Sequence, residues 1–265
     1  MSLASYIPAR LQAGADDGDA RHFCSSCAFS GVCAAEGYDK SSLAELHILV
    51  EHIGPFASGE HIFREGDPFS AIAAVRAGTI KTYVIDDAGN EQVLGFFLPG
   101  EVIGLNAISQ AHYPCNAIAL DTVMLCRFSF PKIATLALRM PGLQQQLFKL
   151  LSSDINKAAL LAGDYSAGER MAAFLVSLSR RYAQRGFSGS CFHLTMARID
   201  IANYLRLAAE TVSRVLRRLE NDGLIRVDRR ELLILDLARL TERARGVLRD
   251  SATGVAAPRA YVRAH

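Results

Sequence analysis

The chain has 265 residues and half of them are hydrophobic, which excludes a disordered or fibrous protein and leaves room for two domains with separate cores. Its net charge of +2 is unevenly divided: residues 169–265 hold 18 Arg, no Lys and 10 Asp or Glu, a net charge of +8, whereas residues 1–168 carry a net charge of −6. The second part of the chain is therefore where phosphate groups are expected to bind.

No segment of the sequence predicts a secretion signal or a membrane span. The first residues, MSLASYIPARLQAGADDGDARH, lack a continuous apolar core, and no later stretch reaches the roughly 18 uncharged apolar residues of a spanning helix. We therefore expect a cytoplasmic protein without a membrane partner. Because the cytoplasm keeps thiols reduced, metal binding, catalysis or burial must explain the six cysteines.

Three of the cysteines lie close together near the N-terminus, within a segment, residues 1–38, that we interpret as an arm and a cysteine loop. Cys24, Cys27 and Cys33 have C-x2-C-x5-C spacing. Three thiolates suit zinc or an iron–sulfur cluster, and each of these needs a fourth ligand. Spacing alone does not choose the metal or that ligand. The candidates for the fourth ligand are Cys115, Cys126, Cys191 and His22.

Residues 39–135 predict a sensor domain rich in short strands. Lys40–His52 has apolar residues at helical spacing and predicts a short amphipathic helix. Between Gly59 and Phe130, β-rich runs alternate with turns that contain glycine, and Asp87–Asn90 predicts a hairpin turn. Regular spacing of this kind predicts a jelly-roll-like barrel. The runs are HIFREGD, AIAAVRAGTIKTYVIDD, NEQVLGFFLPGEVIG and AIALDTVMLCRFSF.

After Pro131 the pattern becomes helical, and Gly142–Ala162 predicts a long helix within residues 136–165. This helix could pack on its own barrel or form a coiled-coil seam with a second copy of the chain. We favour the seam, because a DNA-binding end of the kind described next works best as a homodimer. The expected interface residues are Leu143, Leu147, Leu150, Leu151, Ile155 and Ala158.

Residues 166–250 predict a winged helix-turn-helix, followed by a tail over residues 251–265. A helix over about Ala167–Gln184 and a short strand, FHLTM, come first. Two helices then follow around a tight turn at Leu207 and Ala208, the second over about Ala209–Asn221, and LIRVDRRELLILD predicts the strand pair of a wing. The side chains expected in the core of the two helices are Ile201, Ala202, Leu205, Val212, Val215, Leu216 and Leu219.

The opposite face of the second helix has the chemistry needed to read double-stranded DNA. In the major groove, Arg214 can bond two acceptors of guanine, Glu210 can accept from the cytosine amino group, and Ser213 can contact thymine. Arg217 and Arg218 are better placed to hold phosphates. The pattern therefore indicates a sequence-specific DNA-binding protein.

The run MARIDIANYLRLAAETVSRVLRRLENDGLI resembles the winged helix of the cyclic AMP receptor protein superfamily, and Glu210–Arg214, E-T-V-S-R, resembles the branch of the fumarate and nitrate reduction regulator, FNR. The similarity extends from about Cys24 to Leu240. It implies an α+β fold: an N-terminal cyclic-nucleotide-binding-like β jelly-roll barrel, a long dimerisation helix and a C-terminal winged helix-turn-helix. Ala209 and Ser213 stand where the cyclic-AMP-reading branch typically has Arg and Gly, which implies TTGAT-type half-sites in an inverted repeat.

The resemblance further implies a 4Fe-4S cluster with Cys126, in DTVMLCRFSF, as the fourth ligand of the cysteine loop. It also implies a transcription activator that responds to oxygen, binds DNA as a dimer under anaerobic or low-oxygen conditions, and contacts RNA polymerase through a loop such as Asp86–Asn90. The alternative is a regulator of the same superfamily with a zinc site or no metal, insensitive to oxygen. An electron carrier could use the same cysteines, but it would not need a base-reading helix.

Two further functions are not expected. Cyclic-nucleotide-binding barrels use a Glu and an Arg in the phosphate cassette, whereas this chain has Leu105-Asn106 after the PGEVIG turn and Tyr113–Asn116 at the later position, so no cation is placed to hold the cyclic phosphate. An enzyme is not expected either, because no Ser/His/Asp set or Gly-rich phosphate loop is present in the sequence.

Overall fold

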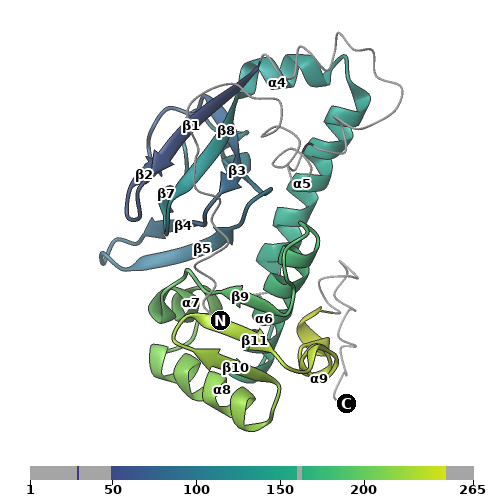
Figure 1. Cartoon of the computed structure of the whole chain (residues 1–265). Helices are drawn as coiled ribbons and strands as arrows, with labels where there is room; N and C mark the ends of the chain where they lie inside the picture. The colour runs from purple at the N-terminus through teal and green to yellow at the C-terminus, as the bar shows by residue number, and fades with distance from the viewer. Residues whose placement is uncertain (1–28, 30–48, 160–162, 249–265) are drawn as a thin grey trace, which may run out of the picture.

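The structure is a computed structural model that describes residue 29 and residues 49–159 and 163–248. A barrel and a smaller mixed unit lie at the two ends of an elongated molecule, and helices connect them along one side (Figure 1). No helix in the described part of the chain is long and apolar enough to cross a membrane.

Two antiparallel four-stranded sheets form the barrel, with strand orders β1-β8-β3-β6 and β2-β7-β4-β5. The side chains of alternate residues point to opposite faces of a strand, and those that face inward, such as Val75, Ile80 and Leu125, form one apolar cluster. The strands are β1 Val50–Phe56, β2 His61–Phe63, β3 Ala71–Ala77, β4 Ile80–Ile85, β5 Glu91–Phe97, β6 Val102–Ile103, β7 Asn116–Ala119 and β8 Val123–Ser129; a 3-10 helix, η2, spans Leu105–Ala107. The predicted jelly-roll-like barrel is confirmed.

The predicted hairpin turn joins β4 and β5. The Asp86 amide donates to the Asn90 carbonyl at 3.0 Å, and Gly89 has a φ of 83°, in the left-handed region that glycine tolerates.

The predicted helix over Lys40–His52 is wrong at its C-terminal end. Residues 40–48 lie outside the described part of the chain, but Val50 begins β1, whose register sets it against Phe128 and His52 against Cys126 of β8. Apolar residues in a short window satisfy both periods, and here pairing with β8 decides in favour of a strand.

Three helices lead from the barrel to the second unit: α4 Phe130–Ala137, α5 Pro141–Ala159 and α6 Ala167–Ala183. α5 runs down one side of the molecule (Figure 1). α6 begins with a capping box, in which Ser166 and Glu169 each bond the other's backbone amide. Gly186, just after this helix, has a φ of 77°, in the left-handed region where glycine commonly follows the end of a helix.

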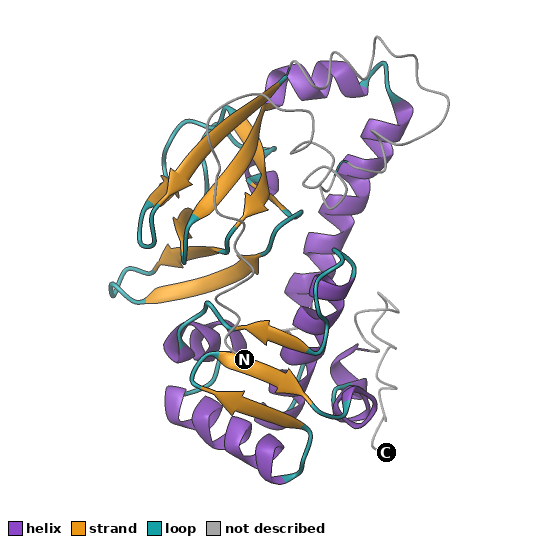
Figure 2. Ribbon diagram, in the orientation of Figure 1, coloured by secondary structure: helices purple, strands orange, loops and turns teal. Residues whose placement is uncertain are grey.

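The second unit is a winged helix-turn-helix, as predicted. Its three-stranded sheet has the order β10-β11-β9 and packs against helices (Figure 2). The elements are β9 Cys191–His193, α7 Arg198–Leu205, α8 Ala209–Asn221, β10 Ile225–Asp228, β11 Glu231–Ile234 and α9 Leu237–Arg243. The strand predicted from FHLTM is shorter and ends at His193.

The sequence did not indicate that the two units share one core. Val93, Phe96 and Leu98 of the barrel belong to the same apolar cluster as the buried residues of the winged helix-turn-helix. The ring centroid of Phe96 lies 5.4 Å from that of Tyr204 in α7 and 6.2 Å from that of Phe174 in α6. The β4–β5 hairpin is therefore packed against the DNA-binding unit.

Candidate DNA interface and cysteine site

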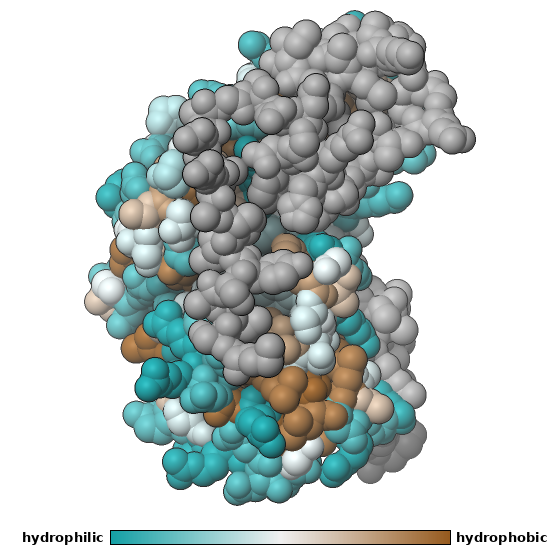
Figure 3. Space-filling model, in the orientation of Figure 1, coloured by the Kyte–Doolittle hydropathy of each residue, from teal (hydrophilic) through white to brown (hydrophobic). Residues whose placement is uncertain are grey.

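The exposed face of α8 carries the predicted DNA-reading residues. Its opposite face is buried: Val212, Leu216 and Leu219 lie in the core, and Val215 is half-buried. The surface over the lower edge of the molecule, where α8 lies, is hydrophilic (Figure 3). The exposed residues are Glu210, Ser213, Arg214, Arg217 and Arg218.

The turn between α7 and α8 sets the angle at which α8 is presented. α7 ends at Leu205, and its C-cap residue Arg206 has a φ of 56°, in the left-handed region. The Leu207 amide then donates to the Ala202 carbonyl at 2.8 Å. Ile201 and Leu205 of α7 are buried against α8, as predicted. The sequence pattern thus predicted both helices and the turn, because each helix buries one apolar stripe.

Two side-chain hydrogen bonds organise the reading face. The Arg214 guanidinium donates from Nη2 to the Thr211 hydroxyl at 3.2 Å, and the Ser213 hydroxyl donates to the Ala209 carbonyl at 3.2 Å. Thr211 was not among the predicted site residues, and its spacing of three from Arg214 on one helix is the signal that could have revealed it.

The wing adds a basic cavity beside α7. A cavity of about 320 Å³ lies between the start of α7 and the β10–β11 turn, lined by Arg198, Arg229 and Arg230 among others. Arg198 Nη1 is buried and has no hydrogen-bond partner among the described residues. Burial lowers the pKa of the Arg198 guanidinium, and Glu220 opposes this effect. Nη2 of the same guanidinium donates to the Arg229 carbonyl at 3.4 Å, so Nη1 is the donor left to bind an anion beside the neighbouring arginines.

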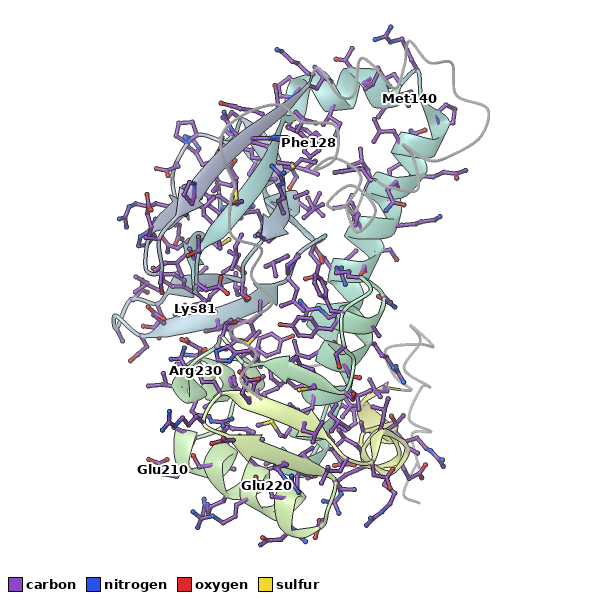
Figure 4. The ribbon with its side chains drawn as sticks, in the orientation of Figure 1. Lys81, Phe128, Met140, Glu210, Glu220 and Arg230 are labelled. Atoms are coloured by element: carbon purple, nitrogen blue, oxygen red, sulfur yellow. The ribbon has the colours of Figure 1, made fainter. Side chains whose placement is uncertain are left out.

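Cys126 lies on the same face of β8 as Phe128, which contacts Phe29. It is half-buried and packs against the same apolar cluster as Phe128, because residues two apart in a strand share a face. Phe29, which is 1% exposed, belongs to that cluster, and its ring centroid lies 5.0 Å from that of Phe128 in an edge-to-face arrangement. Phe128 is labelled in Figure 4. Sequence reasoning missed Phe29, although it is an apolar residue within the cysteine loop.

The other candidate ligands occupy different places. Cys115, immediately before β7, is 1% exposed, and Asn106 Nδ2 donates to its Sγ at 3.4 Å. Burial raises the pKa of the Cys115 thiol, which disfavours the thiolate that a metal needs. Cys191 begins β9 in the DNA-binding unit. The residues Cys24, Cys27, Cys33 and His22 lie outside the described part of the chain, and no cluster of three His, Cys, Asp or Glu that could hold a metal is found within that part.

Part of the predicted dimer seam is buried by its own chain, which corrects the expectation for two residues. Leu143 is 0% exposed, and Leu147 lies beside it in the apolar cluster formed with α4 and the barrel. Leu143 leaves no surface for a second copy, and Leu147, which is 9% exposed, leaves little. Leu150 and Leu151 are partly buried against the same cluster, and the side chain of Ala158 lies outside the described residues.

The solvent face of α5 nevertheless carries two large apolar side chains among its polar ones. Ile155 is 70% exposed and Phe148, seven residues earlier and thus on the same face, is 60% exposed. α5 therefore buries one stripe in its own chain and exposes another.

Comparisons with known proteins agree with both units. Residues 169–243 match the family model of the Crp-like helix-turn-helix domain, and residues 54–139 match that of the cyclic nucleotide-binding domain. The fumarate and nitrate reduction regulatory protein of Escherichia coli K12 is 40% identical over 244 residues, which cover 90% of this chain and 96% of that protein. The chain belongs to the FNR family of transcription regulators.

Other members of the FNR family and its structural neighbours support the same assignment. The transcriptional activator protein anr of Pseudomonas aeruginosa is 41% identical over 228 residues, covering 85% of this chain and 93% of that protein. The structure of FixK2 from Bradyrhizobium japonicum superposes with a TM-score of 0.66 at 27% identity, covering 73% of this chain and 96% of that one. This FNR-family member is thus a DNA-binding transcription regulator.

Proposed function

We propose that this chain is an oxygen- and redox-responsive transcription regulator. It holds a 4Fe-4S cluster on Cys24, Cys27, Cys33 and Cys126 and, as a dimer, binds TTGAT-type inverted repeats under anaerobic or low-oxygen conditions. When bound, such a cluster supplies a redox-active group that depends on thiolate ligands.

The observation that carries the proposal is the contact between Phe29 and Phe128. In the sequence, Phe29 is two residues from Cys27 and four from Cys33, so covalent geometry keeps both thiols near Phe29. Phe128 is two residues from Cys126 on the same face of β8. The contact thus ties the cysteine loop to the strand that carries the proposed fourth ligand. By contrast, the Cys115 thiol is buried, and its sulfur accepts a hydrogen bond from Asn106.

The DNA-binding part of the proposal rests on the exposed residues of α8 and on the wing. Glu210, Ser213 and Arg214 would contact bases, while Arg217 and Arg218 would hold phosphates. The buried, unpaired Arg198 Nη1, in a cavity shared with Arg229 and Arg230, supports a further phosphate contact beside the start of α7.

Two features bear on the partners. The exposed stripe of Phe148 and Ile155 supports dimerisation through α5.

The Asp86–Asn90 turn is exposed at the tip of the β4–β5 hairpin, and hydrogen bonds from the Ala88 and Asn90 amides to the Asp86 carboxylate order it. We propose this acidic turn as a contact with RNA polymerase.

A cyclic nucleotide is not part of the proposal. Leu105, where the cassette needs a Glu, is buried in the apolar cluster below α4, and Cys115 stands in place of the phosphate-binding cation. Neither side chain can compensate the charge of a cyclic phosphate.

Anaerobic purification followed by iron and sulfide analysis and an absorption spectrum tests the cluster. Cys126→Ala should lose the iron, whereas Cys115→Ala, the matched control in the same barrel, should retain it. The opposite result would show that Cys126 is not the fourth ligand. The alternative, an oxygen-insensitive regulator with zinc or no metal, predicts zinc or no metal in the purified protein and equal DNA binding with and without air.

A further inference from the structure

The free edge of β5 is covered by a side chain of the helix-turn-helix. β5 is the last strand in the order β2-β7-β4-β5, so one of its sides has no neighbouring strand. Asn203 of α7 lies along that side: its Oδ1 accepts the Val93 amide at 2.7 Å, and its Nδ2 donates to the Glu91 carbonyl. A primary amide has one kind of donor and one kind of acceptor, as a peptide group has, so Asn203 pairs with β5 as a residue of a neighbouring strand would.

A second polar anchor joins the β4–β5 hairpin to α7. The Lys81 ammonium of β4 lies 2.8 Å from Glu91 Oε2 and 2.9 Å from Asp200 Oδ1 at the start of α7. Lys81 and Asp200 are largely buried. Burial alone would lower the pKa of Lys81, but hydrogen bonds to Glu91 and Asp200 outweigh it and raise that pKa. The ammonium is therefore held charged between the two units.

Both anchors attach to α7 and leave α8 uncovered. Lys81 lies on the side of the barrel that faces the DNA-binding unit, whereas Glu210 and Glu220 lie at the opposite edge of that unit (Figure 4). α7 packs directly against α8. The anchors therefore fix the direction in which α8 points relative to the barrel and α5, without touching the residues that read bases.

We propose that Asn203 and Asp200 are positioning residues that determine which half-site spacing the dimer accepts. The inference rests on the proposed function as a dimeric DNA reader. In a two-fold dimer, the orientation of α8 within each chain sets the distance and angle between the two reading helices. Because successive base pairs rotate about the duplex axis by roughly a tenth of a turn, each added base pair changes the position demanded of the second reader. Rigidly held readers accept one spacer, whereas loosely held readers accept several.

The test compares the anaerobically purified dimer with its Asn203→Ala and Asp200→Asn variants, and Asn221→Ala, at the exposed end of α8, is the matched control. Binding is measured by fluorescence anisotropy on TTGAT inverted repeats with the preferred spacer, on repeats lengthened by one and two base pairs, and on a single half-site. In either variant, the ratio of affinities between the preferred and the lengthened repeats should fall about fivefold or more, while single-half-site affinity stays within about twofold. The control should keep the full ratio.

The inference is overturned if both positioning variants keep the unaltered protein's ratio of affinities for the preferred and the lengthened repeats. It is also overturned if the unaltered protein binds inverted repeats of every spacer length equally well. The proposed function itself is rejected by a different result, in which the unaltered anaerobic protein binds an inverted repeat no more tightly than scrambled DNA. Asp200→Asn retains the size of the side chain, so it decides the question if thermal melting shows that Asn203→Ala does not fold.

Discussion

In the proposed function, Arg214 of α8 contacts a base and Arg218 contacts the phosphate backbone. Arg214 is pre-oriented by the Thr211 hydroxyl on the exposed face of the helix, which reduces the freedom that the guanidinium would lose on binding a base. Arg218, one turn further along, is exposed as well. The two arginines have the same chemistry, so their position on the helix determines their different roles.

Arg214→Ala should therefore weaken binding to the cognate half-site by about 1–3 kcal/mol and relax discrimination at one base pair. Arg218→Ala should weaken binding to all sequences to a similar extent and reduce the slope of log affinity against log salt by about 1. Anisotropy titrations on cognate and singly substituted sites at several salt concentrations measure both effects. Equal loss of discrimination in the two variants would contradict the assignment.

At the scale of elements, the capping box at the start of α6 fixes where this helix begins. The Ser166 hydroxyl accepts the Glu169 amide at 3.3 Å, and Glu169 Oε2 accepts the Ser166 amide at 2.9 Å. Hydrogen bonds from Ser166 lower the pKa of the Glu169 carboxyl. This helix carries much of the core of the DNA-binding unit, so its start affects the stability of the whole unit.

Ser166→Ala should lower the free energy of unfolding by about 1 kcal/mol at pH 7. Because the pKa of Glu169 is lower in the folded than in the unfolded state, its contribution is present above the unfolded pKa and disappears as the pH falls through the folded pKa. The difference between Ser166→Ala and the unaltered protein should therefore shrink below about pH 4. Urea unfolding between pH 3 and pH 7 measures it, and a constant difference would show that Glu169 does not take part.

Local patterns predicted most elements because each buries one stripe or one face. The α8 residues at i, i+3, i+4 and i+7 spacing specified both the bounds of the helix and its exposed face. Val50–His52 shows where this reasoning stops: three residues are too few to distinguish a helical period from a strand period, and only the register with β8 chooses between them.

At the scale of the whole molecule, α5 places large apolar side chains on two different faces. Leu143 holds the helix to its own barrel, whereas Ile155 and Phe148 face solvent. A single apolar periodicity in the sequence cannot separate these faces, because intrachain packing and a coiled-coil seam use the same spacing.

Leu143→Ala should lower the free energy of unfolding of the chain by about 2–5 kcal/mol, with little effect on self-association. Ile155→Asp should have the reverse effect, because a charge in the exposed stripe opposes pairing of two helices but costs nothing in the isolated chain. Sedimentation equilibrium and urea unfolding of both variants measure the two quantities. Dissociation of the Leu143→Ala dimer to the same extent as Ile155→Asp would place the seam on the buried face instead.

The sequence by itself determined the barrel, the helix-turn-helix and the exposed face of α8 that carries Glu210, Ser213 and Arg214, because these depend on periodicity and residue chemistry within short segments. The tertiary structure decided what depends on distant segments: the packing of Phe29 beside β8, the burial of Leu143, and the pairing of Asn203 with the edge of β5, 110 residues away from Val93. Contacts at such separations follow from how the two units pack together, and no local pattern records that packing.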